Sequence, residues 1–298
     1  MKNNENTLHF DRVALIGIGL IGSSLARVLR RDGLAGHIAV CSNTHATLDK
    51  AKELGLADGS EYDARQAVDG ADLVVLCTPL GAYGRIAEVM APGLKPGCIV
   101  TDVGSVKQCV ISDVGPHVPE GCHLVPAHPV AGTEHSGPEA GFAELFHDRF
   151  CIVTPPPGTD QAAVDTVIAL WKAAGSKVES MSAHHHDSVL AMTSHLPHLI
   201  AYTIVGTATD LSDHLMMEVV KYSAGGFRDF TRIAASDPVM WRDVFLSNRE
   251  SVLDVLGRFT EDLTALQRAI RWGEGDKLQE LFTRTREIRR GVIDAKQA

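Results

Sequence analysis

The stretch that decides the fold reads Val13-Ala14-Leu15-Ile16-Gly17-Ile18-Gly19-Leu20-Ile21-Gly22-Ser23-Ser24-Leu25-Ala26. Its apolar start is typical of a buried strand, and the residues after the second glycine have the spacing of a helix. Gly17 permits a tight turn, Gly19 lets the backbone approach a pyrophosphate facing the helix N-terminus, and Gly22 lets helix and strand pack closely. We predict a dinucleotide-binding turn formed by Gly17, Ile18, Gly19, Leu20, Ile21 and Gly22. The alternative is a glycine-rich turn that binds nothing.

The sequence around and after this turn alternates short apolar runs with helical patterns as far as about residue 180, which is the signature of a parallel sheet. The predicted strands are Arg12–Ile16, His37–Cys41, Leu73–Cys77, Ile99–Asp102, His123–Val125, Cys151–Thr154 and Lys177–Met181. We therefore expect an α/β fold whose first domain, residues 1–181, is a Rossmann-type doubly wound parallel sheet. Such sheets bind ligands at the carboxyl ends of their strands, so Thr78 and Pro79 are further candidate cofactor contacts.

From about Ser182 the strand pattern gives way to long amphipathic segments. The predicted helices are Val189–Thr209, Met240–Phe259, and Thr260–Ala298 with a break at Gly273–Gly275. We expect residues 182–298 to form an all-helical domain. Helices that are apolar on more than one side commonly bury the excess against a partner chain, so we predict a homodimer formed through this domain.

The composition is that of an ordinary globular protein: 45% of the 298 residues are hydrophobic and 22% are charged. The 28 basic and 37 acidic side chains give a net charge of −9, so a nucleic acid is not expected as a partner. The uncharged segment Ser188–Thr209 is long enough to span a bilayer, but it contains His195, Pro197 and His198. We interpret it as a buried helix and expect no membrane association.

Six cysteines lie at irregular spacings without a CxxC pair. The apolar stretch that begins at Val13 follows Asp11 and Arg12 and is punctuated by glycines, which is unlike the core of a signal peptide. Reduced thiols in a cytoplasmic protein are the simplest interpretation.

The choice between NAD and NADP depends on the residues that follow the second predicted strand. In many dinucleotide-binding sheets an acid about twenty residues after the glycine turn bonds the ribose hydroxyls of NAD. Here Val40-Cys41-Ser42-Asn43-Thr44 contains neither such an acid nor an arginine that would attract a 2′-phosphate. Either NAD or NADP is open, with a slight preference for NAD because the positive partner is missing. Ser42 and Asn43 are the candidate cofactor contacts.

Five further motifs follow the glycine turn: Asp102-Val103-Gly104-Ser105-Val106-Lys107, Ala127-His128-Pro129-Val130-Ala131-Gly132-Thr133-Glu134, Ser194-His195-Leu196-Pro197-His198, Gly225-Gly226-Phe227-Arg228-Asp229-Phe230-Thr231-Arg232-Ile233-Ala234 and Asp237-Pro238-Val239-Met240-Trp241-Arg242-Asp243. In this order they resemble the prephenate/arogenate (cyclohexadienyl) dehydrogenase family of tyrosine biosynthesis. The resemblance implies oxidative decarboxylation of prephenate to 4-hydroxyphenylpyruvate, or of arogenate to tyrosine. It also implies a Rossmann domain followed by a helical dimerisation domain. The preference between the two substrates stays open.

The residue types in these motifs fit that chemistry. A base has to take the proton of the ring hydroxyl as hydride leaves, and His128 is the candidate base. A dianionic substrate entering a protein of net charge −9 needs local cations, and Lys107 and Arg232 are the candidates. The resemblance implies that Ser105 hydrogen-bonds the hydroxyl and orients His128.

Other candidate substrate contacts surround Arg232. The resemblance implies that Glu134 and Asp229 steer this arginine, and Thr133 and Trp241 belong to the same motifs. A simpler alternative is a surface ion pair between Arg232 and Asp229, three residues apart on a helix, which would contribute under about 1 kcal/mol.

His195 and His198 share a helix face, which raises the question of a metal site. Leu196 stands where an H-E-x-x-H zinc motif needs its glutamate, so no metal is predicted. The resemblance implies instead that both histidines line the substrate pocket. Pro197 leaves the carbonyl of Thr193 without its helical partner, which predicts a kink.

The run His184-His185-His186 is similar to a chelator, but three consecutive residues do not share a helix face, so no metal is predicted here either. His186-Asp187 matches the family, whereas His184 and His185 match no pattern that we can name.

Two other functions compete with this interpretation. A β-hydroxyacid or imine dehydrogenase would typically place a catalytic lysine on a helix of the second domain. Lys221 is the only lysine between residues 178 and 276, and its surroundings resemble the present family instead. A non-catalytic NAD(P)-binding sensor would have no need of a base, so the set of Ser105, His128 and Arg232 favours an enzyme.

Overall fold

The computed structural model describes residues 8–133, 135–209, 218, 221–222 and 225–294. Contacts within the chain divide it into two compact units, Met1–Arg249 and Glu250–Ala298. The first unit holds the sheets and the helices that pack on them, and the second holds two long helices.

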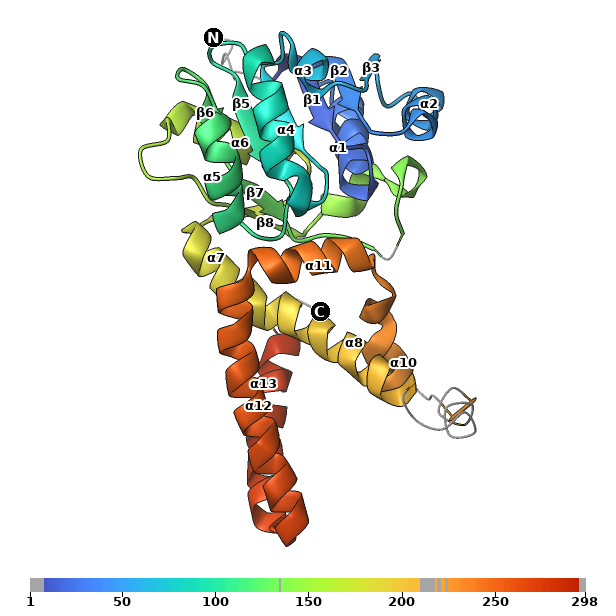
Figure 1. The fold of residues 1–298 in the computed structure, drawn as a ribbon, viewed down its shortest axis with the longest axis vertical. Coiled ribbons are helices and arrows are strands. Elements are labelled where there is room, and N and C mark those ends of the chain that lie inside the picture. Colours follow the sequence, from blue (N-terminus) through green and yellow to red (C-terminus); the bar gives the residue numbers. More distant parts are fainter. Residues whose placement is uncertain (1–7, 134, 210–217, 219–220, 223–224, 295–298) are drawn as a thin grey trace, which may run out of the picture. The chain divides into compact units, whose positions relative to one another are not determined.

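A six-stranded parallel sheet forms the centre of the first unit (Figure 1). Its strands are β1 (Phe10–Ile16), β2 (Ala35–Cys41), β3 (Gly59–Glu61), β4 (Leu73–Leu76), β5 (Ile99–Asp102) and β6 (His123–Leu124). The spatial order is β3-β2-β1-β4-β5-β6, and every neighbouring pair is parallel. This is the doubly wound order, which reverses between β1 and β4, and it confirms the predicted fold class.

Helices cover both faces of this sheet. They are α1 (Leu20–Arg31), α2 (His45–Glu53), α3 (Ala64–Val68), α4 (Tyr83–Met90), α5 (Gln108–Val114) and α6 (Gln161–Ala173). Successive residues of β1 alternate between two apolar clusters: Val13 and Leu15 pack with α1 and α6, whereas Ala14 and Ile16 pack with α3, α4 and α5. Burial on both faces explains why the predicted strands read as unbroken apolar runs.

A second, three-stranded sheet was not predicted. It consists of β7 (Ala127–Pro129), β8 (Phe150–Val153) and β9 (Lys177–Ser180), in the order β7-β8-β9, with β7 antiparallel to β8. The strands expected at Cys151–Thr154 and Lys177–Met181 therefore form, but in a separate sheet. The sequence pattern missed β3 and β7, because strands of three residues without an apolar run leave almost no signal.

The helices of the first unit that follow the sheets are α7 (Ala183–Leu190), a π-helical turn η6 (Ala191–His195), α8 (Leu196–Thr209), α10 (Gly225–Thr231), the 3₁₀ turn η7 (Arg232–Ala235) and α11 (Pro238–Ser247). The π turn lies directly before Pro197, where a kink was expected. Ala183–Ala208 is the one described helical stretch long and apolar enough to cross a membrane, a test that the core helix of a soluble protein also passes.

The predicted helix Met240–Phe259 is wrong as a single element. Helix α11 ends at Ser247, and α12 (Arg249–Trp272) begins after Asn248, whose φ of −108° and ψ of 33° interrupt the helix. In the second unit, Gly273 (φ 69°) separates α12 from α13 (Gly275–Asp294), at the expected break.

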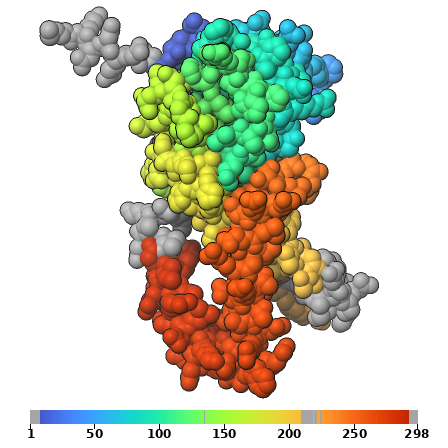
Figure 2. Space-filling model, turned by 60° about the vertical axis from the view of Figure 1, so that its left-hand side comes forward, coloured from blue at the N-terminus to red at the C-terminus, as the bar shows by residue number. Residues whose placement is uncertain are grey.

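Helix α11 packs against the first half of the chain. Trp241 and Val244 belong to the same apolar cluster as Tyr83 and as Leu80 of the 3₁₀ turn η1 (Leu80–Ala82). Figure 2 shows α11 (orange) lying directly against the sheet-containing part. Helix α11 is thus anchored next to the carboxyl end of β4.

Candidate active site

The glycine turn between β1 and α1 has the predicted geometry. Gly17 adopts φ 101°, and a Cβ there would lie 2.7 Å from the backbone of Cys77. A Cβ on Gly22 would lie 2.4 Å from the carbonyl oxygen of Gly17. Gly19, by contrast, has no atom within 4 Å of its Cβ position, so open space adjoins the backbone where a pyrophosphate is expected.

The surroundings of this turn fit a bound dinucleotide. No side chain caps the N-terminus of α1, and its first turn contains no acidic residue, so its amide dipoles are available to an anion. Thr78 follows β4, on the other side of the point where the strand order reverses, and its Oγ1 is buried without a hydrogen-bond partner in the described part of the chain. Ser42 and Asn43 follow β2 at the same edge of the sheet.

His128 lies on β7 and is 8% exposed. Its Nδ1 is 2.8 Å from Nε2 of His186 on α7, and Nδ1 of His186 is 2.7 Å from Oδ1 of Asp187. Both partners are fully buried. We call these three residues the triad.

Two backbone amides hold the carboxylate of the triad in place. The N–H of Lys107 donates to Oδ1 of Asp187 at 2.7 Å, and the N–H of Gln108 donates to Oδ2 at 2.9 Å. Burial works against an ionised Asp187, but these bonds and that from His186 outweigh it and lower the pKa of the carboxyl. The triad therefore contains an ionised carboxylate at its buried end.

Burial favours the neutral form of both histidines of the triad. Burial is the main cause that holds the pKa of His128 well below its usual range, and its electrostatic interactions with His186 and Lys107 lower it further. Burial likewise lowers the pKa of His186, although Asp187 opposes the shift. A neutral imidazole is the form of His128 that can accept a proton.

Lys107 does not occupy the position expected of a substrate ligand. Its side chain is fully buried, with Nζ 2.5 Å from Oδ2 of Asp102 and 2.8 Å from the carbonyl oxygen of Ala127. Asp102 also accepts a hydrogen bond from the amide of Ala127, the residue before His128. The ammonium of Lys107 is buried, paired with Asp102 and bonded to the first residue of β7. Because it is already paired and removed from solvent, Lys107 is not available to a substrate carboxylate.

A second group of rings lies beside the triad. Nδ2 of Asn248 is 2.8 Å from the carbonyl oxygen of Asp187 and 3.1 Å from Nδ1 of His195. The ring of His195 meets Trp241 edge-on, and Trp241 stacks on His198 with the ring centroids 3.6 Å apart. The structure thus brings His195, His198 and Trp241 together, and their predicted contact with substrate stays a prediction.

The family model described as the nucleotide-binding domain of prephenate dehydrogenase matches residues 25–180, and the model of the prephenate dehydrogenase dimerization domain matches residues 182–284. The chain belongs to the prephenate dehydrogenase family.

Relatives within the prephenate dehydrogenase family cover nearly all of the chain. It is 43% identical to the cyclohexadienyl dehydrogenase of Zymomonas mobilis, over 94% of this chain and 95% of that protein. It is 32% identical to the prephenate dehydrogenase of Bacillus subtilis, over 95% of this chain and 76% of that protein.

Solved structures of the family superpose closely. The complex of the Aquifex aeolicus prephenate dehydrogenase with hydroxyphenyl propionate and NAD+ gives a TM-score of 0.89 at 34% identity, over 96% of this chain and 99% of that chain. The Synechocystis arogenate dehydrogenase gives 0.78 at 27% identity, over 93% and 98%. The chain is accordingly an oxidoreductase.

Arg232 of this prephenate dehydrogenase family member is exposed on η7, and its charge lowers the pKa of His198 after the larger effect of burial. Asp229 is also exposed, and its Oδ1 lies 3.1 Å from Nε of Arg228. Thr133 is exposed and accepts a hydrogen bond from the amide of His135 at 3.2 Å. Glu134 lies outside the described residues.

Sequence reasoning missed three residues of this prephenate dehydrogenase family site. His186 and Asp187 match the family motif without an assigned role, and the apolar spacing predicts Asn248 within a continuous helix. Ser105, the residue expected to orient His128, is half-buried, and the Nδ1 atom of His128 faces His186 instead. The signal that could have found His186 and Asp187 was their adjacency in a family motif.

Proposed function

We propose that the chain catalyses the NAD(P)-dependent oxidative decarboxylation of prephenate to 4-hydroxyphenylpyruvate, of arogenate to tyrosine, or of both, in tyrosine biosynthesis. The observation that carries the proposal is the buried His128, which lies in the same domain as the predicted dinucleotide-binding turn and is held by His186 and Asp187 of the following helix. A protein that only senses a dinucleotide has no need of such a base.

The residues that would hold the cofactor are those of the glycine turn, Ser42, Asn43, Thr78 and Pro79. When bound, the nicotinamide supplies the acceptor for the hydride that leaves the ring carbon. His128 takes the proton of the ring hydroxyl as the ketone forms, and the ring carboxylate leaves as carbon dioxide while the ring becomes aromatic. Because aromatisation drives that loss, the protein has mainly to align and charge-balance the substrate.

We place the substrate between the two groups of side chains described above. Arg232 is the proposed partner of a substrate carboxylate, because guanidinium groups bind carboxylates bidentately. The half-buried ring of His198, stacked on Trp241, offers an aromatic surface to the substrate, and His195 lies behind it as a further proposed contact. Further proposed substrate contacts at the rim of the same site are Thr133, Glu134, Asp229 and Ser105.

The proposed cofactor preference is NAD. Carboxylates crowd the end of β2, where Glu61 pairs with Cys41 in the register of β2 and β3. Burial first, then the charges of Asp63 and Glu61, raises the pKa of the Cys41 thiol to about 11. A 2′-phosphate at this edge would be repelled by these charges.

The decisive experiment follows reduced-nicotinamide absorbance with prephenate or arogenate, each combined with NAD or NADP. We expect turnover of at least one substrate, at a higher rate with NAD than with NADP. Comparison of the rates with prephenate and with arogenate then gives the substrate preference. A folded protein that binds NADH yet turns over neither substrate would instead be the dinucleotide sensor.

We also propose a cytoplasmic homodimer. The name of the matched dimerization domain and the exposed apolar side chains of α12 and α13 support the dimer. The six cysteines, all present as free thiols, support a reducing compartment.

A further inference from the structure

We propose that Asp187 and His186 act as positioning residues that fix the tautomer of His128, so that its basic lone pair is on Nε2, the atom turned away from the triad. The inference rests on the proposed function for its catalytic meaning, because His128 is the proposed base. The tautomer itself is a property of the free protein and can be measured without any substrate.

The direction of each hydrogen bond follows from the buried end of the triad. An ionised carboxylate only accepts, so Nδ1 of His186 must donate to Asp187. A neutral His186 then has a bare Nε2, which can only accept. Its partner at 2.8 Å, Nδ1 of His128, must therefore be the donor, and the remaining lone pair of His128 is on Nε2.

A competing arrangement reverses the function. If His186 were doubly protonated, its Nε2 would donate to Nδ1 of His128, and the proton of His128 would move to Nε2. His128 would then present a donor to the substrate in place of a base. The full burial of His186, whose desolvation disfavours a second proton, argues against this state.

The groups around Asp187 favour its ionised state. The amides of Lys107 and Gln108 lie at the start of α5 and supply two donors to the carboxylate. On the other side, Asn248 donates to the carbonyl of Asp187 and so holds the backbone of α7. Both oxygens of the carboxylate therefore accept hydrogen bonds, two at Oδ1 and one at Oδ2, and these bonds favour the ionised form.

The test compares three variants by side-chain length. In His186→Asn the shorter amide can still donate to Asp187 but cannot reach His128. In His186→Gln the longer amide can accept from His128 while donating to Asp187. His184→Asn, on the exposed face of the same helix, is the matched control. Thermal unfolding establishes that each variant is folded. If His186→Asn does not fold, the tautomer of His128 in the wild type and in His186→Gln still tests the inference.

The first readout is ¹⁵N NMR of the histidine rings in the substrate-free protein, with His128 assigned by His128→Asn. We expect the proton on Nδ1 in the wild type and in the Gln variant, and a mixed or inverted tautomer in His186→Asn. A wild-type proton on Nε2, or a tautomer unchanged in His186→Asn, would overturn the inference.

The second readout is turnover. We expect kcat to fall roughly tenfold to a hundredfold in His186→Asn, with KM nearly unchanged and most of kcat restored in His186→Gln; this is part of the roughly 10²- to 10⁴-fold that a positioned base contributes. Equal losses in the Asn and Gln variants would show a merely structural role. If the tautomer is as expected and no substrate is turned over, the positioning stands and the proposed function fails.

Discussion

His128 owes its proposed reactivity to burial more than to its neighbours in the sequence. A buried imidazole loses solvation when it is charged, so its pKa falls and it stays a base at pH values where an exposed histidine is protonated. We expect the acid limb of the kcat/KM profile to lie below pH 6.5 as a result. In His128→Asn, kcat should drop about 10²- to 10⁴-fold with a modest change in KM. Initial rates over a pH series measure both, and a limb at or above 6.5 would contradict the assignment.

Arg232 and Arg228 provide a matched pair of arginines on neighbouring turns. Arg228 is paired with Asp229 at an exposed site, whereas the charge of Arg232 is felt by His198. Arg232→Ala should raise KM for the substrate by roughly tenfold to a hundredfold, the range expected from loss of a charged hydrogen bond. Arg228→Ala should change KM little. Steady-state kinetics distinguish them, and equal effects of the two variants would remove Arg232 from the substrate site.

His195 links the site to the pH dependence of stability. Burial lowers the pKa of His195 to about 4, so the unfolded chain binds a proton at a higher pH than the folded chain does. The contribution of His195 to stability is complete above pH 6.5 and is lost as the pH falls toward 4, by about 2 kcal/mol between 6.5 and 5. Urea unfolding of the wild type and His195→Gln at pH 7.5 and 5 measures it. A variant with the same pH dependence as the wild type would disprove this account.

For single residues, the sequence predicts which side chains carry the chemistry better than it predicts which side chains bond to one another. His128, Trp241 and the two histidines near Pro197 could be found because motifs carry residue types at fixed spacing. The partner of His128 is 58 positions away and could not be found so, because the bond is tertiary. Lys107 was misassigned because a sequence does not reveal that a charge is buried and paired.

Among the elements, the turn between β1 and α1 allows a sharp test of the roles of its glycines. Gly19→Ala adds a methyl group where nothing lies within 4 Å, so the melting temperature should stay nearly unchanged while the Kd for NADH rises about tenfold or more. Gly22→Ala forces Cβ against the carbonyl of Gly17 and should destabilise the fold by about 1 to 3 kcal/mol. Differential scanning fluorimetry and NADH fluorescence separate the two effects. Loss of stability in Gly19→Ala would contradict this division of roles.

The elements that could be predicted are those with a strong pattern. Long apolar strands and amphipathic helices show their period, whereas β3 and β7 have too few residues to show one. Pro197 marked the position of the π turn because a missing N–H has a fixed local consequence. The break at Asn248 carried no such mark, because the apolar spacing continues across it.

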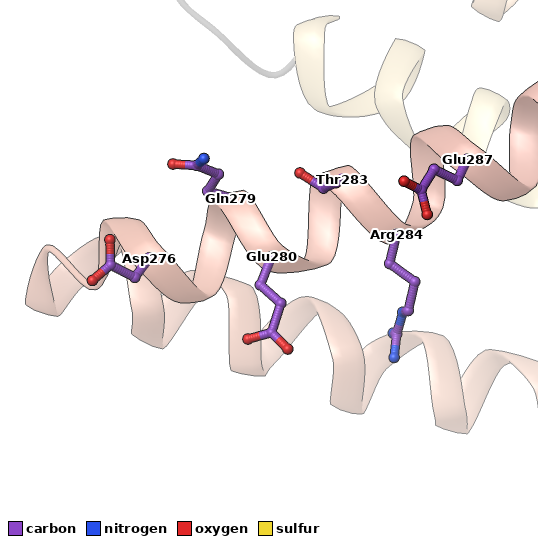
Figure 3. A pocket seen from close by; sticks show the side chains of 6 residues that line it. All are labelled: Asp276, Gln279, Glu280, Thr283, Arg284 and Glu287. Carbon is purple, nitrogen blue, oxygen red and sulfur yellow. The ribbon is translucent and has the colours of Figure 1, made fainter.

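For the whole molecule, self-association is the property that the helices after Asn248 predict. Their exposed apolar side chains include Leu253, Leu263, Ile270, Trp272, Phe282 and Ile288. Figure 3 shows, in contrast, a polar hollow along α13, lined by Asp276, Gln279, Glu280, Thr283, Arg284 and Glu287. None of these six side chains belongs to the predicted site.

Light scattering tests the dimer with one variant among the exposed apolar side chains and one among the residues of the polar hollow. We expect the wild type to have the mass of a dimer and Ile288→Glu to dissociate on dilution, because a charge would be buried in an apolar interface. Gln279→Glu, which adds the same charge to the polar hollow of the same helix, should remain a dimer. A wild type that is monomeric at every concentration would remove the proposal.

The bonds from Asp187 to the amides of Lys107 and Gln108 cross the point near residue 181 where the two family models meet. Homologous recombination at that point would join a carboxylate from one parent to amides from the other. Because every residue except proline supplies a backbone amide, chimeras of diverged relatives should keep activity only where both parents place the start of α5 and the carboxylate alike. His128 comes from one half of the chain and the residues that position it come from the other, and this restricts which crossovers selection can tolerate.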